Sequence, residues 1–216
     1  MTNSTVSGNN TIGDYSHGGR LRVSYGNATL TDSTVSGNHT TGFNAQGGGL
    51  RVRYGNATLT NSTISGNSTA GHYGGGGGLH VYGNISLTNS TVSGNSTAGD
   101  YSSGGGLRAG DGITTLINST VSGNRTAGIN SHGGGLAVGD ATLINSTVSG
   151  NRTTGNGSQS GGLQLRYYNA TLNNSTVTNN HAIEGGGGIG FSFGNYSQSL
   201  TLISTILAGN TGPSDN

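Results

Sequence analysis

The sequence contains no cysteine, no tryptophan and no lysine, and only one of its 216 residues is proline. The absence of cysteine excludes a disulfide-stapled scaffold and any metal site built from thiolates. Charged residues make up 7% of the chain, with eight arginines against seven acids, so the net charge is +1. Such a weak field favours neither nucleic acid nor an anionic membrane surface as a partner. No run approaches about 18 apolar residues, so membrane insertion is not expected.

Glycine, in contrast, is abundant at 45 residues, while hydrophobic residues make up 29% of the chain. A glycine-rich polar chain without periodicity would be expected to stay disordered. This chain is periodic, because a phrase of the form NSTVSGN recurs every 27–29 residues, starting at Asn3, Asp32, Asn61, Asn89, Asn118, Asn145, Asn174 and, in degenerate form, Ile203. Stacked repeats of this kind can share one core, which a single repeat could not form.

Each period also contains a phrase GGxLxV, followed by a turn and the phrase ATLT, as in residues 48–60. The alternation of apolar and polar residues within LxV, ATLT and TVS predicts three short strands per period. Their inward residues predict four aliphatic columns, of which the TVS column runs from Val6 to Ile206. The sequence therefore predicts an all-β, right-handed parallel β-helix solenoid of about 7.5 coils. Residues 1–210 are expected to form its single domain and residues 211–216 a polar tail.

Asparagine recurs at two positions of the coil, once at the N-S bend before TVS, where Asp32 replaces it in the second coil, and once at the end of NSTVSGN. Short polar side chains at bends can hydrogen-bond the backbone and each other, so both columns are predicted to form ladders, the first with its side chains turned toward the core. The glycine-rich arm between the second asparagine and the next LxV leucine keeps one length in six coils, from Asn9–Leu21 to Asn151–Leu163. This constancy predicts an arm that is wound into the coil rather than a free loop.

The phrases NSTVSGN, GGGLxV and TLTNST, with LISTILAGN near the C-terminus, resemble those of the right-handed β-helix proteins of the pectate-lyase-like superfamily. They resemble most closely the bacterial and archaeal surface or secreted proteins with STISGN and GGG repeats. The resemblance covers the whole chain and implies an extracellular or cell-surface location. Because that superfamily includes lyases, hydrolases, adhesins and coat proteins, the resemblance implies fold more strongly than activity. Met1 falls inside a coil, so we expect a truncated N-terminus, with either a preceding stretch of solenoid or end-to-end contact through the exposed edge.

The middle position of LxV is predicted to point outward, and in the first four coils it carries arginine or histidine. A further arginine and three tyrosines follow close behind. Guanidinium groups pair with uronate or sulfate groups, and aromatic rings stack on sugars. The sequence therefore indicates a carbohydrate-binding strip made of Arg22, Arg51, Arg53, His80, Arg108, Tyr25, Tyr54 and Tyr82.

Two alternatives stay open beside this one. A polysaccharide lyase or glycoside hydrolase would need two or three carboxylates around a cleft, and no two acids are neighbours within one coil. An ice-binding protein would use a flat double file of hydroxyl side chains about 4.8 Å apart between coils. The candidates for that file are Thr34, Ser36, Thr63, Ser65, Thr91, Ser93, Thr120, Ser122, Thr147 and Ser149.

No cofactor is expected, and the six histidines show no spacing typical of metal ligands. The leading hypothesis is a non-catalytic, extracellular or cell-surface β-helix module that serves as a spacer or adhesin and binds polysaccharide or a cell-surface glycan.

Overall fold

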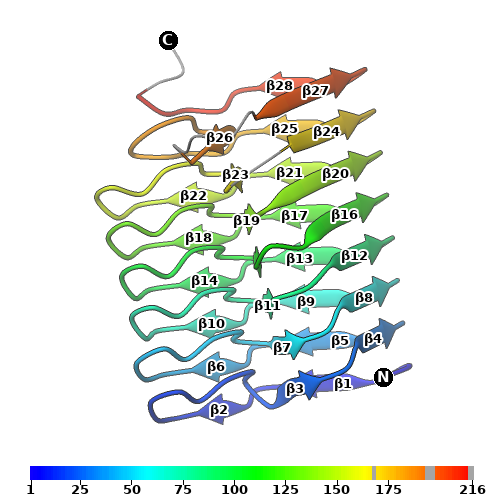
Figure 1. Ribbon diagram of the computed structural model, residues 1–216, viewed down its shortest axis with the longest axis vertical. Coiled ribbons are helices and arrows are strands. Elements are labelled where there is room, and N and C mark those ends of the chain that lie inside the picture. The colour runs from blue at the N-terminus through cyan, green and yellow to red at the C-terminus, as the bar shows by residue number, and fades with distance from the viewer. Residues whose placement is uncertain (167–168, 193–197, 214–216) are drawn as a thin grey trace.

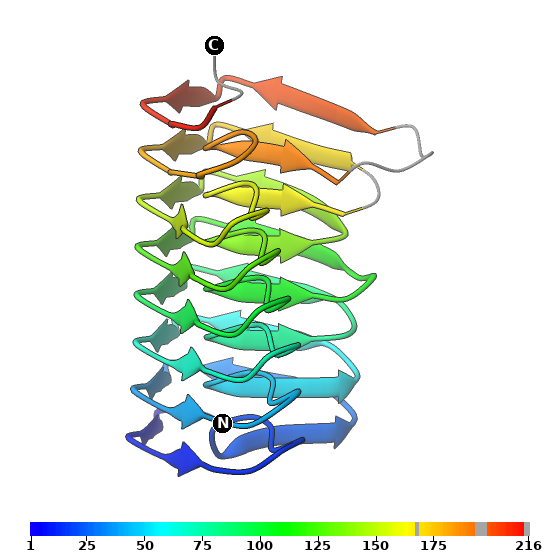
Figure 2. The ribbon, with the colours of Figure 1, turned by 90° about the vertical axis from the view of Figure 1, so that its left-hand side faces the viewer.

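The protein is an all-β parallel solenoid, as the computed structural model, which describes residues 1–166, 169–192 and 198–213, shows. Its strands stack in register from coil to coil in four parallel sheets, and the coils follow one another along a single axis (Figures 1 and 2). The described residues contain no helix, and thus no helix that could cross a membrane. The predicted fold class is confirmed.

The first two sheets follow the NSTVSGN phrase. The TVS sheet has eight strands: β1 (Thr5–Ser7), β5 (Thr34–Ser36), β9 (Thr63–Ser65), β13 (Thr91–Ser93), β17 (Thr120–Ser122), β21 (Thr147–Ser149), β25 (Thr176–Thr178) and β28 (Ile206–Ala208). A second sheet has six strands of two residues each: β2 (Asn10–Thr11), β6 (His39–Thr40), β10 (Ser68–Thr69), β14 (Ser96–Thr97), β18 (Arg125–Thr126) and β22 (Arg152–Thr153). This short strand was not among the three predicted per coil.

The other two sheets come from the second half of each period. The LxV sheet has seven strands: β3 (Leu21–Tyr25), β7 (Leu50–Tyr54), β11 (Leu79–Val81), β15 (Leu107–Ala109), β19 (Leu136–Val138), β23 (Leu163–Leu165) and β26 (Ile189–Phe191). The ATLT sheet also has seven: β4 (Ala28–Thr31), β8 (Ala57–Thr60), β12 (Ile85–Thr88), β16 (Ile113–Ile117), β20 (Asp140–Ile144), β24 (Asn169–Asn173) and β27 (Ser199–Ile203).

The aliphatic columns predicted from the repeat form the core. Leu50, Leu59 and Ile64 represent three of them, and each is almost completely buried. The prediction was wrong at one position of the TVS column in the last coil, because Leu207, not Ile206, pairs with Val177. The degenerate final phrase is one residue longer than the 29-residue spacing that the sequence suggested. A leucine therefore occupies the inward position in that coil.

The asparagine that ends NSTVSGN forms a ladder, as predicted, and the structure places this ladder inside the solenoid. The side chains of Asn38, Asn67, Asn95, Asn124, Asn151 and Asn180 are all buried. Each Nδ2 atom donates a hydrogen bond to the Oδ1 atom of the next coil's asparagine, as in Asn95 to Asn124 at 3.0 Å. The same Nδ2 donates to a backbone carbonyl of the preceding coil, so the ladder joins three successive coils. It satisfies polar groups that the narrow core would otherwise leave unpaired.

The asparagine at the N-S bend faces solvent instead of the core, contrary to expectation. Asn61 and its equivalents adopt a positive φ, near +50°, which turns the backbone and exposes their side chains. They still form a ladder, with Asn89 Nδ2 donating to Asn61 Oδ1 at 3.2 Å. The following serine turns inward: Ser62 is buried, and its hydroxyl donates to the carbonyl of Thr60. Asparagine tolerates the left-handed conformation better than most residues, which explains why it precedes serine at this corner.

The glycine-rich arm packs on the outer face of the LxV sheet, wound into the coil as predicted. Its glycines allow backbones of successive coils to touch, since a Cβ atom at Gly77 would lie 2.3 Å from the carbonyl oxygen of Gly105. The arm carbonyl of Gly74 accepts a hydrogen bond from Arg108, the middle residue of β15, at 2.9 Å. Side chains on the outer face of the LxV sheet therefore lie under the arm.

Candidate functional site

The middle residues of the LxV strands point away from the aliphatic core, but most are not exposed as predicted. Arg51 is 4% exposed and His80 is 2% exposed, because the arm covers them. Arg108 is half-buried, and only Arg22, in the first coil, is exposed. The four residues stand in register on β3, β7, β11 and β15. The predicted strip is thus a mostly covered column with an opening at its N-terminal end.

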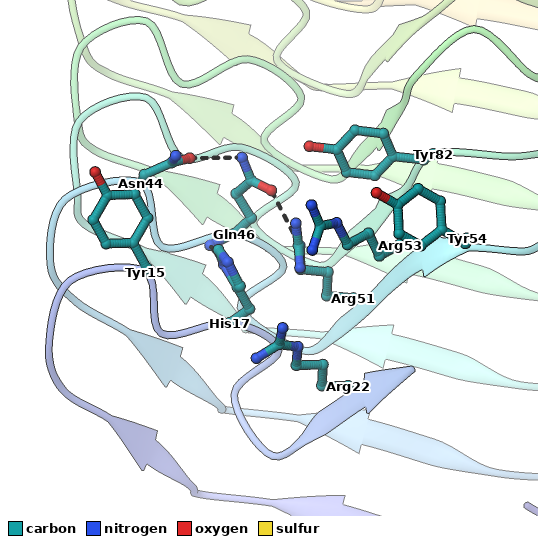
Figure 3. Close-up of a pocket in the computed structure, with 9 residues that line it drawn as sticks. All are labelled: Tyr15, His17, Arg22, Asn44, Gln46, Arg51, Arg53, Tyr54 and Tyr82. Carbon is teal, nitrogen blue, oxygen red and sulfur yellow. Dashed lines mark hydrogen bonds between the residues drawn. The ribbon is translucent and has the colours of Figure 1, made fainter. Parts of the chain in front are cut away.

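That opening is a pocket of about 540 Å³ over the first three coils. Figure 3 shows two groups of side chains facing one another across it: residues of the arm on one side and residues of the strands on the other. The pocket is lined by Tyr15, His17, Asn44 and Gln46 from the arms, and by Arg22, Arg51, Arg53, Tyr54 and Tyr82 from the strands and the turn after β11. We call it the arginine pocket.

Five of the eight residues proposed for carbohydrate binding line this pocket: Arg22, Arg51, Arg53, Tyr54 and Tyr82. The other three, Tyr25, His80 and Arg108, do not. The arm residues were missed by the sequence analysis. Because the arm keeps its length between Asn9 and Leu21 and in later coils, its side chains recur at fixed distances from LxV, and this constancy was the signal that could have placed them.

Positive charge is concentrated in the pocket. Three guanidinium groups line it and no carboxylate does. The only ion pair among the described residues joins His72 and Asp100, at 3.4 Å, outside this lining. Arg51 donates through Nε to Gln46 Oε1 at 3.1 Å, while its buried Nη1 has no hydrogen-bond partner among the described residues. An uncompensated guanidinium in a partly buried site favours an anionic ligand.

The pKa values of the neighbouring groups reflect this charge. Burial, followed by the charges of Arg51, Arg22 and Arg53, lowers the pKa of His17 to about 4. Burial also lowers the pKa of Arg51, although the neighbouring Tyr82, over whose ring the guanidinium lies, opposes that effect. The pKa of His80 lies well below its usual value because of burial and of the adjacent Arg108 and Arg51. Both histidines are therefore neutral at pH 7, and the arginines supply the charge of the site.

The tyrosines offer less free ring surface than the sequence suggested. Tyr54 stacks on Tyr25 with ring centroids 5.2 Å apart, and the Arg53 guanidinium lies 4.9 Å from its centroid. Tyr82 stacks on His80 at 5.1 Å, and Arg51 lies 5.6 Å from its centroid. The rings thus hold the arginines in place, and contacts to a ligand through guanidinium and hydroxyl groups are better supported than stacking on sugar rings.

The acidic residues serve mainly to join coils. Asp14, Asp100 and Asp140 each accept a hydrogen bond from a backbone amide of the next coil, at 2.8 Å in all three cases. Glu184 accepts one from Gly157. The described residues contain no group of three histidine or acidic side chains that could hold a metal ion. Asp215 lies outside the described residues. The cleft lined by carboxylates that a lyase or hydrolase would need is not present at the arginine pocket.

The predicted hydroxyl files lie on the outer face of the TVS sheet and are regular. Each threonine pairs with the threonine of the next coil and each serine with the next serine, as in Thr63 with Thr91 and Ser65 with Ser93. All ten of these side chains are half-buried.

Comparison of the chain with protein-family models, with curated proteins and with solved structures found no match. The fold and the pocket define a class, a parallel β-solenoid with a cationic surface site.

Proposed function

We propose that this solenoid is a module that binds acidic polysaccharide, and that the arginine pocket holds an anionic group, uronate or sulfate, of the sugar chain. One observation carries the proposal: three arginines line one pocket without a carboxylate. Guanidinium groups bind carboxylate and sulfate oxygens through charge-assisted hydrogen bonds. The amides of Asn44 and Gln46 and the hydroxyls of Tyr54 and Tyr82 supply partners for sugar hydroxyls around the anion.

The distribution of charge favours a polysaccharide over a nucleic acid. The net charge of the whole chain is only +1, and the other five arginines, at 20, 108, 125, 152 and 166, do not line the pocket. Nucleic acids bind to extended basic surfaces that contact many phosphates, whereas this site is a single local concentration of charge. A pocket of about 540 Å³ lies within the size range of small-ligand sites.

Binding to an array of neutral, uronate-containing and sulfated glycans tests the proposal. Replacing the exposed Arg22 and Arg53 together by Gln should weaken binding to acidic glycans about tenfold to a hundredfold, because each removes a charge-assisted contact. The matched control replaces Arg125 and Arg152, which are exposed on β18 and β22, and should bind like the parent protein. Equal losses in both variants, or no binding of acidic glycans by the parent, would contradict a specific site.

We also propose a superfamily, a location and a mechanical role for this module. Membership of the pectate-lyase-like superfamily and an extracellular or cell-surface location are supported by the repeat phrases. Seven stacked coils at about 4.8 Å give a rod about 35 Å long, which suits a spacer or adhesin stalk. Aliphatic side chains such as Leu202 and Leu207 are exposed at the last coil. They would be covered by end-to-end contact between two copies.

A second candidate function is ice binding through the hydroxyl files of the TVS sheet. The observation in its favour is their unbroken register over five successive coils, from Thr34 and Ser36 to Thr147 and Ser149. If it is correct, micromolar protein should stop recrystallisation of ice, and Thr91→Tyr, which places a ring in the middle of the file, should remove most of that effect. Normal recrystallisation in the presence of the parent protein would end this candidacy.

A further inference from the structure

His17 lies in the wall of the arginine pocket, and the function proposed above gives it no role in ligand binding. It belongs to the arm of the first coil, is half-buried, and faces Arg22, Arg51 and Arg53 across the pocket (Figure 3). Its Nδ1 atom accepts a hydrogen bond from the backbone amide of Gln46, at 3.2 Å. In the neutral ring the proton is therefore on Nε2.

We infer that His17 takes up a proton when an anionic group enters the arginine pocket, and so becomes a fourth cationic contact of the ligand. The inference rests on the proposed function and adds a proton-linked residue to the same site.

All the charges that act on His17 in the free protein are positive. Burial and the three arginines keep its pKa near 4. The other titratable groups that line the pocket are Tyr15, Tyr54 and Tyr82, and no carboxylate lies among them. Asp14, the nearest acid along the chain, does not line the pocket and accepts a hydrogen bond from the amide of Phe43. The free pocket thus lacks any negative charge that could stabilise an imidazolium.

An anion supplies the missing negative charge. Placed among the guanidiniums, it compensates their repulsion of a proton on His17 and attracts the imidazolium directly. Protonation of Nδ1 costs the hydrogen bond from Gln46, which the contact between imidazolium and anion has to outweigh. Because linkage is reciprocal, a ligand that raises the pKa of His17 must itself bind more tightly as the pH falls.

The size of the effect follows from the two pKa values. If the bound anion raises the pKa of His17 from about 4 to between about 5.5 and 6.5, the association constant at pH 5 exceeds that at pH 7.5 by between about fourfold and thirtyfold. The same values correspond to an uptake of roughly 0.7 to 0.9 proton per site at about pH 5, and almost none at about pH 7.5.

Isothermal titration calorimetry with dextran sulfate oligosaccharides measures both quantities. Their sulfate esters do not titrate in this range, so any proton taken up binds to the protein. Titrations at about pH 5 and pH 7.5, each in two buffers of different ionisation enthalpy, give the affinity and the number of protons. The result expected is tighter binding with proton uptake at the lower pH.

Two single substitutions test whether His17 is the residue that takes up the proton. His17→Gln keeps an acceptor for the Gln46 amide but cannot be charged, so its affinities at pH 5 and pH 7.5 should become equal to within about twofold and the proton uptake should disappear. His39→Gln removes a histidine of β6 that bonds to Ser68 and does not line the pocket, and it should keep the full pH dependence. If both variants lost the pH dependence of binding equally, this dependence would not be specific to His17. The inference would then be wrong.

The outcomes separate the two proposals. Binding of the sulfated sugar with equal affinity and no proton uptake at both pH values overturns the role of His17 and leaves the arginine pocket in place. Failure to bind at either pH overturns both. The folded state must persist at pH 5, where His17, His80 and His132, whose pKa values lie below those of the unfolded chain, make it less stable than above pH 6.5. Thermal denaturation at each pH verifies this.

Discussion

Val92→Asp is expected to abolish folding of the central coils. Val92 is completely buried in the TVS column and pairs with Ile64 on one side and Val121 on the other. An aspartate there would have no polar partner, and burying an unpaired carboxylate, or protonating it, costs several kcal/mol beyond the lost burial of valine. We expect a protein that is insoluble, or one whose melting temperature falls by about 20 °C or more. Circular dichroism during thermal denaturation measures the change.

Ser93→Asp is the control for this prediction. It adds the same charge to the next residue of the same strand, β13, but on the outer face, where Ser93 is half-buried. Its melting temperature should fall by only a few degrees. A well-folded Val92→Asp protein would show that the inward and outward faces of this strand have been exchanged.

Asn95→Ala is expected to have the second largest effect, because it interrupts the internal asparagine ladder. Asn95 Oδ1 accepts hydrogen bonds from the backbone amide and the Nδ2 of Asn67, while its own Nδ2 donates to Asn124 Oδ1 and to the carbonyl of Ile64. Removal of the amide leaves these buried groups without partners, at a cost of about 3–6 kcal/mol. Urea denaturation should show this loss in the free energy of unfolding.

The exposed ladder at the N-S bend supplies the comparison. Asn89 makes a similar pair of side-chain hydrogen bonds, donating to Asn61 and accepting from Asn118, but its partners are accessible to water. Asn89→Ala should cost about 1–2 kcal/mol, most of it from the positive φ that alanine tolerates poorly. If the two substitutions were equally costly, burial would not be what makes the internal ladder important.

The sequence alone was sufficient to predict the solenoid and its core. Leucine and valine at fixed phases of a 27–29-residue repeat can be buried together only if the coils stack, so Leu59 and Ile64 could be placed correctly without coordinates. A ladder at the asparagine that ends NSTVSGN was predicted too, but its burial was not, because the core-facing orientation was assigned to the asparagine of the N-S bend. Where the repeat degenerates, the prediction failed: one additional residue before Leu207 moved the inward position away from Ile206.

At the corners of the coil, the backbone conformation determines which side chains point toward the core. The residue types alone do not fix that conformation. The phrase N-S was correctly read as a bend, yet only the positive φ at Asn61 shows that asparagine turns outward and serine inward. Either residue could have satisfied the buried carbonyl, because both carry a short hydrogen-bonding side chain.

The tertiary structure decided the site. Alternation along β7 correctly directed Arg51 away from the aliphatic core, but a strand pattern cannot show what covers its outer face. The glycine-rich arm does so: it buries Arg51 and His80 and leaves an opening at Arg22 and Arg53. It also brings His17 and Gln46, which precede their strands in the sequence, against the arginines. A repeat determines which residues share a column, whereas a pocket between two columns depends on how the arm folds back over the sheet.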